Sequence, residues 1–540
     1  MKTPSLATGP EGGIRDLASL LALLGLATLA LATFADYGVG WDEPGLRTYG
    51  RLLLDFYTSG LVDRRFAEFA DLAYYGGAFE LLWAALEPFV PGDPFLGRHL
   101  ACALVGIAGV AATAAIARRI AGARAGLFAA LLLALMPDWY GHMFINAKDI
   151  PFATAMALAL WLACRLLEEW PRPRLSSVVG FGLATGAAVG VRVGGLAAPL
   201  ALLLPLLLSV AARTRRLGPG PALADVAPGL WRLLPSVPVA VLVTLLTWPW
   251  IGLGPDHLVE AIRHFASLDF PTPILFEGAV LPATEAPRRY LLVLLASKLP
   301  EIVLLGLAAL VLFGGRGAWA DPRLVAVATA AGWPILHAVL AAPTAFDGIR
   351  HHLFVLPPLA VLAAIGLDRL LGAASARARL MLAALLLLGA GTAAARLVIT
   401  HPYQYVAFNA LAGGTAGAQG RFELDYWGTA LRELARETAA ALDREGLGRP
   451  GRPWLVAVCG EPGTVEPILP PWLALADEID RADVLLAALR PGCPAVPPDR
   501  RLAEVQRAGA VLAVAGIRSA RLAAARAGAV AKLAETGSLP

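Results

Sequence analysis

The sequence is short of charge and, among its charged residues, of lysine. Only 16% of the 540 residues are charged, whereas 57% are hydrophobic and the mean hydropathy is +0.64. Soluble chains carry about 25% charged residues, so this composition excludes an ordinary soluble protein. Only four of the 45 basic residues are lysines. A lysine at a membrane edge of so arginine-rich a chain is therefore a candidate functional residue.

Cysteine is also scarce, and the net charge is small. The charge of +4 is spread along the chain, which does not favour a nucleic-acid partner. Four cysteines make no disulfide framework. Cys102 and Cys164 lie in apolar runs and are interpreted as small core residues. Cys459 and Cys493 are interpreted as two unrelated thiols, with a disulfide as the alternative if their region is extracytosolic.

Nucleotide and metal motifs are missing from the sequence as well. There is no P-loop, GxSxG or dinucleotide fingerprint, which argues against a cytosolic nucleotide substrate. No ligand spacing such as HExxH occurs, so we expect no cofactor. A divalent metal remains the alternative, because seven of the eight histidines fall on predicted outer segments.

Long apolar runs recur through the first 400 residues and predict a multi-span helical membrane protein. The first run, 17–34, would extend about 27 Å as a helix, close to the thickness of a bilayer core. It is too long for a signal peptide and predicts an uncleaved span. About eleven spans are expected, near residues 17–34, 99–117, 125–137, 150–168, 175–192, 194–211, 233–251, 289–312, 324–341, 352–371 and 380–398.

Arginine is concentrated in alternate connections, which predicts the orientation. Loops rich in basic residues stay in the cytoplasm, so the N-terminus is expected inside and residues after about 400 outside. The first outer loop, 35–98, holds two amphipathic stretches, 46–60 and 78–90, that are typical of helices lying in the membrane interface. The second outer loop, 252–288, is rich in proline.

The chain changes character after residue 400. Short apolar runs at 454–460, 482–489 and 509–516 alternate with charged, helix-favouring segments. That alternation predicts a small extracytosolic α/β domain over 401–540, following a transmembrane domain over 1–400. The aromatic segment between 401 and 428 suits either an interfacial belt or a surface on which sugars stack.

An acidic pair, Asp42-Glu43, follows the first span directly. Ionisable groups at a membrane face usually mark a site, and a carboxylate there could take a proton from an attacking hydroxyl. The alternative is structural: Asp42 could cap the helix that follows, with Pro44 in its first turn.

A second polar segment lies between the third and fourth predicted spans. It contains His142, Asn146, Lys148 and Asp149. A lysine beside a helix N-terminus makes an anion site, because the free N–H groups and the helix dipole add to its charge. Asp149 orients a substrate in this interpretation and caps the fourth span in the alternative.

Cations from separate spans are predicted on the same outer side. Arg98 opens the second span, Arg192 ends the fifth and Arg350, followed by His351, opens the tenth. A guanidinium can grip phosphate oxygens in bidentate fashion, although Arg350 could also snorkel to the interface. Lys298 is expected to pair with Glu301 in its own helix. Together, these cations and acids suit an anionic lipid headgroup with a base beside it.

These features in this order resemble the GT-C superfamily of polyprenyl-phosphate-sugar-dependent glycosyltransferases. The nearest group is family 39, with the protein O-mannosyltransferases and lipid A aminoarabinose transferases. The resemblance covers about residues 15–400. It rests on Asp42-Glu43 and the two interfacial helices, the run from Arg98 to Gly122, Pro137, Asp149-Ile150-Pro151 and Arg350 with the apolar run LPPLAVLAA.

The resemblance implies a bacterial inner-membrane enzyme that moves a hexosyl- or pentosyl-type sugar from a polyprenyl-phosphate donor to an acceptor hydroxyl, with inversion. Asp42 would act as base, with Glu43 or Asp149 orienting a substrate. Arg98, Lys148, Arg192 and Arg350 would hold the phosphate, with His142, Asn146 and His351 as further contacts. The acceptor could be a glycan, a lipid or a protein.

Two departures from the family pattern stand out. His351 replaces the tyrosine expected after the late arginine, and residues 73–77 lack the Lys-Pro-Pro signature of the aminoarabinose transferases. The second departure weakens the expectation of an aminoarabinose donor. A transporter or flippase for an anionic lipid or sugar is the alternative function, and a non-catalytic assembly partner is a third.

Overall fold

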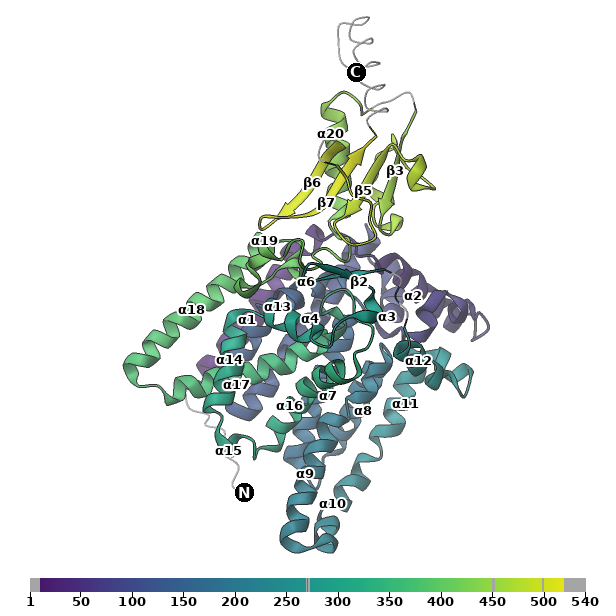
Figure 1. Ribbon diagram of the computed structural model, residues 1–540. Helices are drawn as coiled ribbons and strands as arrows, with labels where there is room; N and C mark the ends of the chain where they lie inside the picture. Colours follow the sequence, from purple (N-terminus) through teal and green to yellow (C-terminus); the bar gives the residue numbers. More distant parts are fainter. Residues whose placement is uncertain (1–9, 269, 271, 449–451, 498–499, 519–540) are drawn as a thin grey trace, which may run out of the picture.

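The computed structural model describes residues 10–268, 270, 272–448, 452–497 and 500–518. It is a bundle of apolar helices that carries a mixed β-sheet at one end (Figure 1). The predicted fold class, a multi-span helical membrane protein with a C-terminal α/β region, is confirmed.

The number of spans is eight to ten by length and composition in the described part of the chain. Eight helical segments are long and apolar enough to cross a bilayer, and two bent pairs, α5–α6 and α13–α14, raise the number to ten. The predicted span 175–192 is a shorter apolar helix of 15 residues, which explains the difference from eleven. The bundle helices are α1 (Pro10–Thr33), α4 (Pro94–Ala121), α5 (Ala123–Ala134), α6 (Pro137–Ile145), α7 (Asp149–Glu169), α8 (Leu175–Val189), α9 (Leu200–Leu217), α10 (Pro219–Leu233), α11 (Ser236–Thr247), α13 (Tyr290–Lys298), α14 (Glu301–Phe313), α15 (Gly315–Ala318), α16 (Pro322–Ala341), α17 (Leu356–Ala373) and α18 (Ala376–Ile399).

The helices differ sharply in how much of their apolar surface the protein covers. In α7 and in the span Arg350–Ala373, which ends with α17, 72% and 78% of the most apolar window is buried, so these two form the centre of the bundle. In the α1 and α18 spans the values are 11% and 6%. Soluble proteins rarely expose apolar surface on this scale, so the outer faces of α1 and α18 contact lipid.

Two spans are broken, and a buried ion pair joins the breaks. Proline ends the first helix of each pair, giving bends of 65° between α5 and α6 and 112° between α13 and α14. Lys298, the last residue of α13, donates to Asp138 of α6 at 3.1 Å and to the Tyr405 carbonyl at 2.7 Å. The predicted pair of Lys298 with Glu301 is therefore wrong, because Glu301 pairs with Arg396 instead.

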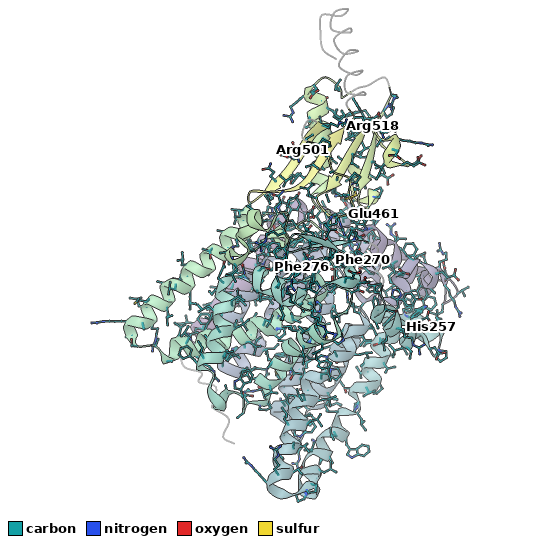
Figure 2. The ribbon with its side chains drawn as sticks, viewed as in Figure 1. His257, Phe270, Phe276, Glu461, Arg501 and Arg518 are labelled. Atoms are coloured by element: carbon teal, nitrogen blue, oxygen red, sulfur yellow. A yellow bond between two sulfur atoms is a disulfide. The ribbon has the colours of Figure 1, made fainter. Side chains whose placement is uncertain are left out.

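The two long connections, 35–98 and 252–288, are more ordered than the sequence indicates. The two amphipathic stretches form α2 (Glu43–Thr58) and α3 (Ala78–Leu86). The proline-rich second loop contains α12 (His257–Ala266) and a hairpin of β1 (Ile274–Phe276) and β2 (Ala279–Leu281), which the sequence does not predict. Phe276 of the hairpin forms an isolated antiparallel β-bridge with Phe422. Phe276 lies where the bundle meets the C-terminal region (Figure 2).

The C-terminal sheet has the strand order β4-β3-β5-β7-β6. β3 is parallel to β4 and β5, whereas β7 is antiparallel to β5 and β6. The three predicted apolar runs correspond to β3, β5 and β7, while β4 and β6 are additional. The five strands are β3 (Trp454–Cys459), β4 (Leu473–Leu475), β5 (Val484–Ala488), β6 (Arg501–Arg507) and β7 (Ala510–Ile517). The region also contains the helices α19 (Gly414–Ala418) and α20 (Leu431–Arg444).

A disulfide joins the end of β3 to the segment that follows β5. It links Cys459, the last residue of β3, to Cys493, with a Cα–Cα distance of 5.7 Å. The interpretation of two unrelated thiols is wrong, because the pairing of β3 with β5 brings distant sequence positions together. Cys102 and Cys164 are buried, as predicted.

The aromatic segment between 401 and 428 is packed inside the protein. Tyr403, Tyr405, Phe408, Tyr426 and Trp427 are each at most 2% exposed. Neither an interfacial belt nor a sugar-stacking surface fits that burial. These rings instead fill the junction between the bundle and the sheet.

Candidate functional site

Charged side chains from three distant segments meet near the end of the bundle that carries the sheet. Asp42 precedes α2, Lys148 precedes α7, and Arg350 begins the 3₁₀ helix η8 (Arg350–Val355). The Asp42 Oδ2 atom is 3.0 Å from Lys148 Nζ and 3.5 Å from Arg350 Nη1. The structure therefore brings the predicted base into contact with two of the predicted phosphate ligands.

Asp149 is the second carboxylate of this cluster. It forms ion pairs with Arg192, just before η5 (Val193–Ala197), and with Arg350 at 3.6 Å. Asn146 donates from Nδ2 to Asp149 Oδ2 at 2.8 Å. The three cations Lys148, Arg192 and Arg350 are thus held together by Asp42 and Asp149.

Asp347 is the third carboxylate, and it orients Arg350. The Nε and Nη2 atoms of Arg350 lie 2.8 Å from Asp347 Oδ2. Asp347 and Gly348 have φ values of +56° and +64°, a left-handed turn that glycine adopts at low cost. The Arg350 guanidinium also lies over the Trp427 ring, 5.2 Å from its centroid.

The structural alternatives for these residues are not observed. The side chains of Asp42 and Asp149 make no capping hydrogen bond to α2 or α7. Arg350 does not snorkel to the interface, because its side chain is only 6% exposed and bound to carboxylates. These polar groups are therefore arranged around one another rather than around helix ends.

The cations determine the charge state of Asp42. Burial alone would raise its pKa, but the charges of Lys148 and Arg350 outweigh burial and lower the pKa to about 2. The Asp42 side chain is 24% exposed, more than Asp149 or Asp347. Asp42 is thus an ionised carboxylate that a bound molecule can reach.

The pKa values of two neighbouring carboxyl groups, Asp347 and Glu423, shift upward instead. Burial raises the pKa of Asp347 and raises that of Glu423 to about 8, and the Asp347 charge adds to the second shift. Arg490 opposes both shifts. Glu423 is therefore protonated at neutral pH.

A buried hydrogen-bond chain supports Asp149 from the other side. His142 Nε2 is 2.8 Å from the Tyr426 hydroxyl, and His142 Nδ1 is 3.2 Å from Asn146 Nδ2. Asn146 also accepts the Asp149 backbone N–H at 2.8 Å. His142 and Asn146, the predicted substrate contacts, are both fully buried and hydrogen-bonded on the side of Asp149.

Two predicted site residues lie apart from the cluster. Glu43 is 1% exposed and accepts from the Gly40 backbone N–H at 2.7 Å, and its other oxygen is 3.0 Å from His99 Nε2. Arg98 is fully buried and donates to Glu80 at 2.8 Å. Their contacts join α2 and α3 to α4 and lie apart from Lys148, Arg192 and Arg350.

His351 lines a cavity of about 240 Å³ beside the cluster, with Tyr75, Arg192 and His352. Tyr75 faces the cations, with Lys148 Nζ 4.4 Å from its ring centroid and Arg192 at 5.5 Å. The cavity therefore has a cationic wall and room for a small polar group.

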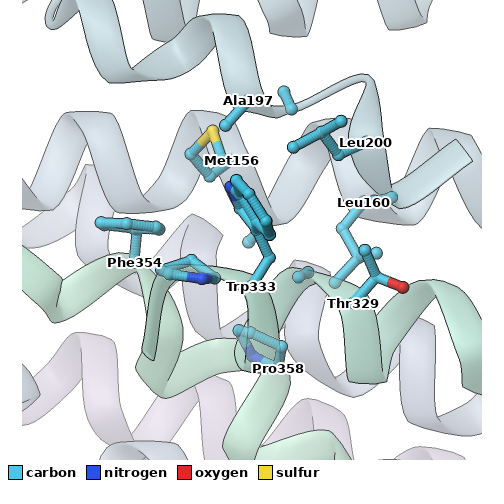
Figure 3. Close-up of a pocket in the computed structure, with 13 residues that line it drawn as sticks. Met156, Leu160, Ala197, Leu200, Thr329, Trp333, Phe354 and Pro358 are labelled. Carbon is cyan, nitrogen blue, oxygen red and sulfur yellow. The ribbon is translucent and has the colours of Figure 1, made fainter. Parts of the chain in front are cut away.

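An apolar pocket lies next to this cavity along α16. Met156, Leu160, Trp333 and Phe354 line it, and the Trp333 ring occupies its centre (Figure 3). Trp333 lies one turn of α16 from His337 of the cavity, with ring centroids 6.3 Å apart. The apolar pocket is therefore a separate space that lies one helical turn from the cavity along α16.

Sequence reasoning missed several residues of this site. Asp347 could have been found from the sequence, because it precedes Arg350 by three residues and the two can pair. Tyr75, Glu423 and Arg490 join the site through tertiary contacts alone. Among the described residues, no group of three or more His, Cys, Asp or Glu side chains is arranged to hold a metal ion.

Comparison with known proteins identifies the segment that holds much of this site. Residues 83–235 match the dolichyl-phosphate-mannose-protein mannosyltransferase family. The predicted resemblance is confirmed over this segment, which includes Lys148, Asp149 and Arg192 but neither Asp42 nor Arg350. No curated protein matches the chain.

Several solved structures are similar to this chain at low sequence identity. ArnT from Cupriavidus metallidurans in the apo state is 17% identical with a TM-score of 0.49, over 92% of this chain and 97% of that chain. ArnT bound to undecaprenyl phosphate is 15% identical with a TM-score of 0.48, over 93% and 98%. The oligosaccharyltransferase AglB from Archaeoglobus fulgidus is 14% identical with a TM-score of 0.45, over 87% and 69%.

Proposed function

We propose that this protein is a membrane glycosyltransferase that moves a sugar from a polyprenyl-phosphate donor to an acceptor hydroxyl. One observation carries the proposal: a partly exposed carboxylate, Asp42, lies against Lys148 and Arg350 beside a cavity of about 240 Å³. The family match to enzymes of dolichyl-phosphate-mannose supports a lipid-phosphate donor.

The cations suit the donor phosphate. Lys148, Arg192 and Arg350 converge from three segments, and Arg192 lines the cavity. A phosphate held there would place its lipid tail toward the apolar pocket at Trp333 and its sugar toward Asp42. Fixed positive charge also favours departure of the lipid phosphate, because that group gains negative charge as it leaves.

Asp42 is the proposed general base. As the acceptor oxygen bonds to the anomeric carbon, its proton passes to the Asp42 carboxylate, and the bond from that carbon to the phosphate oxygen breaks. The electron pair of the broken bond stays on the polyprenyl phosphate. A single displacement of this kind inverts the anomeric centre. Asp149 and Asp347 hold Arg192 and Arg350 in place and do not touch the reacting atoms.

The test is an assay of full-length protein in membranes with labelled polyprenyl-phosphate hexoses and pentoses. Transfer of label to a hydroxyl acceptor, lost in Asp42→Asn, supports the enzyme. Movement of intact donor across the bilayer without bond cleavage would instead support a transporter or flippase. The charges gather at one end of the bundle rather than at its middle, where transporters bind their substrates, which favours the enzyme.

We further propose that the sheet and the site face the extracytosolic side of a bacterial inner membrane, with the N-terminus in the cytoplasm. The arginine-rich loops and the Cys459–Cys493 disulfide support this orientation. In intact cells, Ala440→Cys should react with an impermeant thiol reagent and Arg215→Cys should not; both positions are exposed. The reverse labelling pattern would refute the orientation.

A further inference from the structure

The C-terminal region contributes one side chain to the charged site. Arg490 follows β5, at the end of the strand that faces the bundle, where Glu461 marks the matching end of β3 (Figure 2). Ligands of open α/β sheets bind outside the carboxyl ends of the parallel strands. Here those ends lie against the membrane site.

Arg490 touches the site at three points. Its Nη1 donates to the Tyr426 carbonyl at 2.7 Å, and its guanidinium lies 5.3 Å from the Trp41 ring centroid. Its Nη2 is 3.8 Å from Asp347 Oδ1. Asp347 therefore stands between two guanidinium groups, with Arg350 on Oδ2 and Arg490 on Oδ1.

These contacts do not satisfy the Arg490 side chain, which is only 6% exposed. In the described part of the chain, its Nε has no hydrogen-bond partner, and neither has Asp347 Oδ1. A buried guanidinium without full pairing costs stability. Arg490 and Asp347 thus each keep one buried polar atom without a partner where the C-terminal region meets the site, which points to a role for Arg490 there.

The disulfide sets the position of Arg490. The Cys493 backbone N–H donates to the Arg490 carbonyl at 3.3 Å, and Cys493 is bonded to Cys459 of β3. The short segment that carries Arg490 is therefore tied to the sheet at both ends, through β5 and through the disulfide.

We propose that Arg490 is a positioning residue of the transfer site, which holds Asp347 against Arg350 so that the Arg350 guanidinium is set for the donor phosphate, and that the Cys459–Cys493 disulfide keeps Arg490 in place. This inference rests on the proposed function. It makes the C-terminal region a part of the active site rather than an appended module.

The test measures binding of polyprenyl monophosphate to the full-length protein in detergent, alongside thermal unfolding. Arg490→Gln should weaken binding by roughly two- to thirtyfold, the range for a residue that acts through a neighbour. Arg490→Lys should recover part of the loss, because it restores the charge but not the planar fork. Arg452→Gln is the matched control, since Arg452 pairs with Asp483 at 2.9 Å near the amino end of β3 and should leave binding unchanged.

Reduction of the Cys459–Cys493 disulfide provides a second test of the inference. Reduction of the wild type should weaken binding to a similar extent and should add nothing in the Arg490→Gln background, because both act on one element. Unchanged binding in Arg490→Gln, or equal losses in Arg452→Gln, would overturn the inference. Absence of binding in the oxidised wild type would overturn the proposed function itself, and this inference with it.

Discussion

Replacement of Asp42 by asparagine should slow sugar transfer and tighten donor binding at the same time. Asparagine keeps the shape of the side chain but carries no charge and accepts no proton at neutral pH. The loss of a general base lowers the rate by about 10²–10⁴. Donor binding changes in the opposite direction, because Asp42 occupies Lys148 and Arg350 in the free protein.

The size of the binding effect follows from the contacts that are released. Asp42 makes one hydrogen bond to Lys148 at 3.0 Å and a longer ion pair with Arg350 at 3.5 Å. A hydrogen bond to a charged group contributes about 1.5–3 kcal/mol, so a phosphate that no longer competes with it should bind roughly 10- to 100-fold more tightly. The longer contact adds less, since Arg350 keeps its bonds to Asp347.

The two effects are separated by single-turnover transfer at saturating donor and by equilibrium binding of polyprenyl monophosphate. Asp36→Asn is the matched control: Asp36 also lies at the outer end of the first span, but it pairs with His401 and is 51% exposed. That variant should behave as the wild type. Normal turnover in Asp42→Asn would remove the base assignment, and weaker phosphate binding would show that Asp42 does not compete for the cations.

Three further predictions concern the charges around the site. Lys148→Gln and Arg350→Gln should each weaken polyprenyl monophosphate binding by about 1.5–3 kcal/mol. The double variant should lose less than the sum in a double-mutant binding cycle, because both residues hold one phosphate. Strictly additive losses would show that the two residues do not share that phosphate. Burial raises the folded-state pKa of Glu423 to about 8, above its ordinary 4.5, so stability should fall as pH rises from 4.5 to 8, by up to about 1.4 kcal/mol per unit. Thermal unfolding of Glu423→Gln, measured across this pH range, should show no such loss of stability. An equal loss in the wild type and the variant would contradict the raised pKa of Glu423. Lys298→Met should lower the free energy of unfolding by about 3–5 kcal/mol by leaving Asp138 buried and unpaired, and Asp138→Asn in that background should restore part of it.

The membrane architecture could be predicted from the sequence because each span is encoded locally. A run of about 20 apolar residues specifies a spanning helix without reference to the rest of the chain. The exception, α8, is short at 15 residues, and the sequence alone does not show where its last turn ends. The apolar runs likewise predict the strands β3, β5 and β7, whereas β6, RLAEVQR, has neither a continuous apolar run nor a strict alternation of polar and apolar residues.

The candidate site was predictable only in part, for a different physical reason. Asp42, Lys148, Arg192 and Arg350 each stand at a predicted span edge, so topology alone places them on one side of the membrane. Glu43 stands at an equally good position, yet its side chain turns toward His99 and α4. Which member of the acidic pair faces the site depends on the residue at which α2 begins. The sequence pattern does not define that residue.

The charge balance of the site gives a reason why Asp42 acts only when donor is bound. In the free protein, three cations face Asp42, Asp149 and Asp347, and the pKa of Asp42 is lowered to about 2. So weak a base cannot activate a hydroxyl near neutral pH. The donor phosphodiester brings one negative charge to the same cations, and bond cleavage leaves a second on the lipid phosphate. Each charge weakens the hold of Lys148 and Arg350 on Asp42 and raises its proton affinity. The base therefore gains strength as the leaving group departs, which ties proton removal to cleavage of the donor and leaves the acceptor unactivated in its absence.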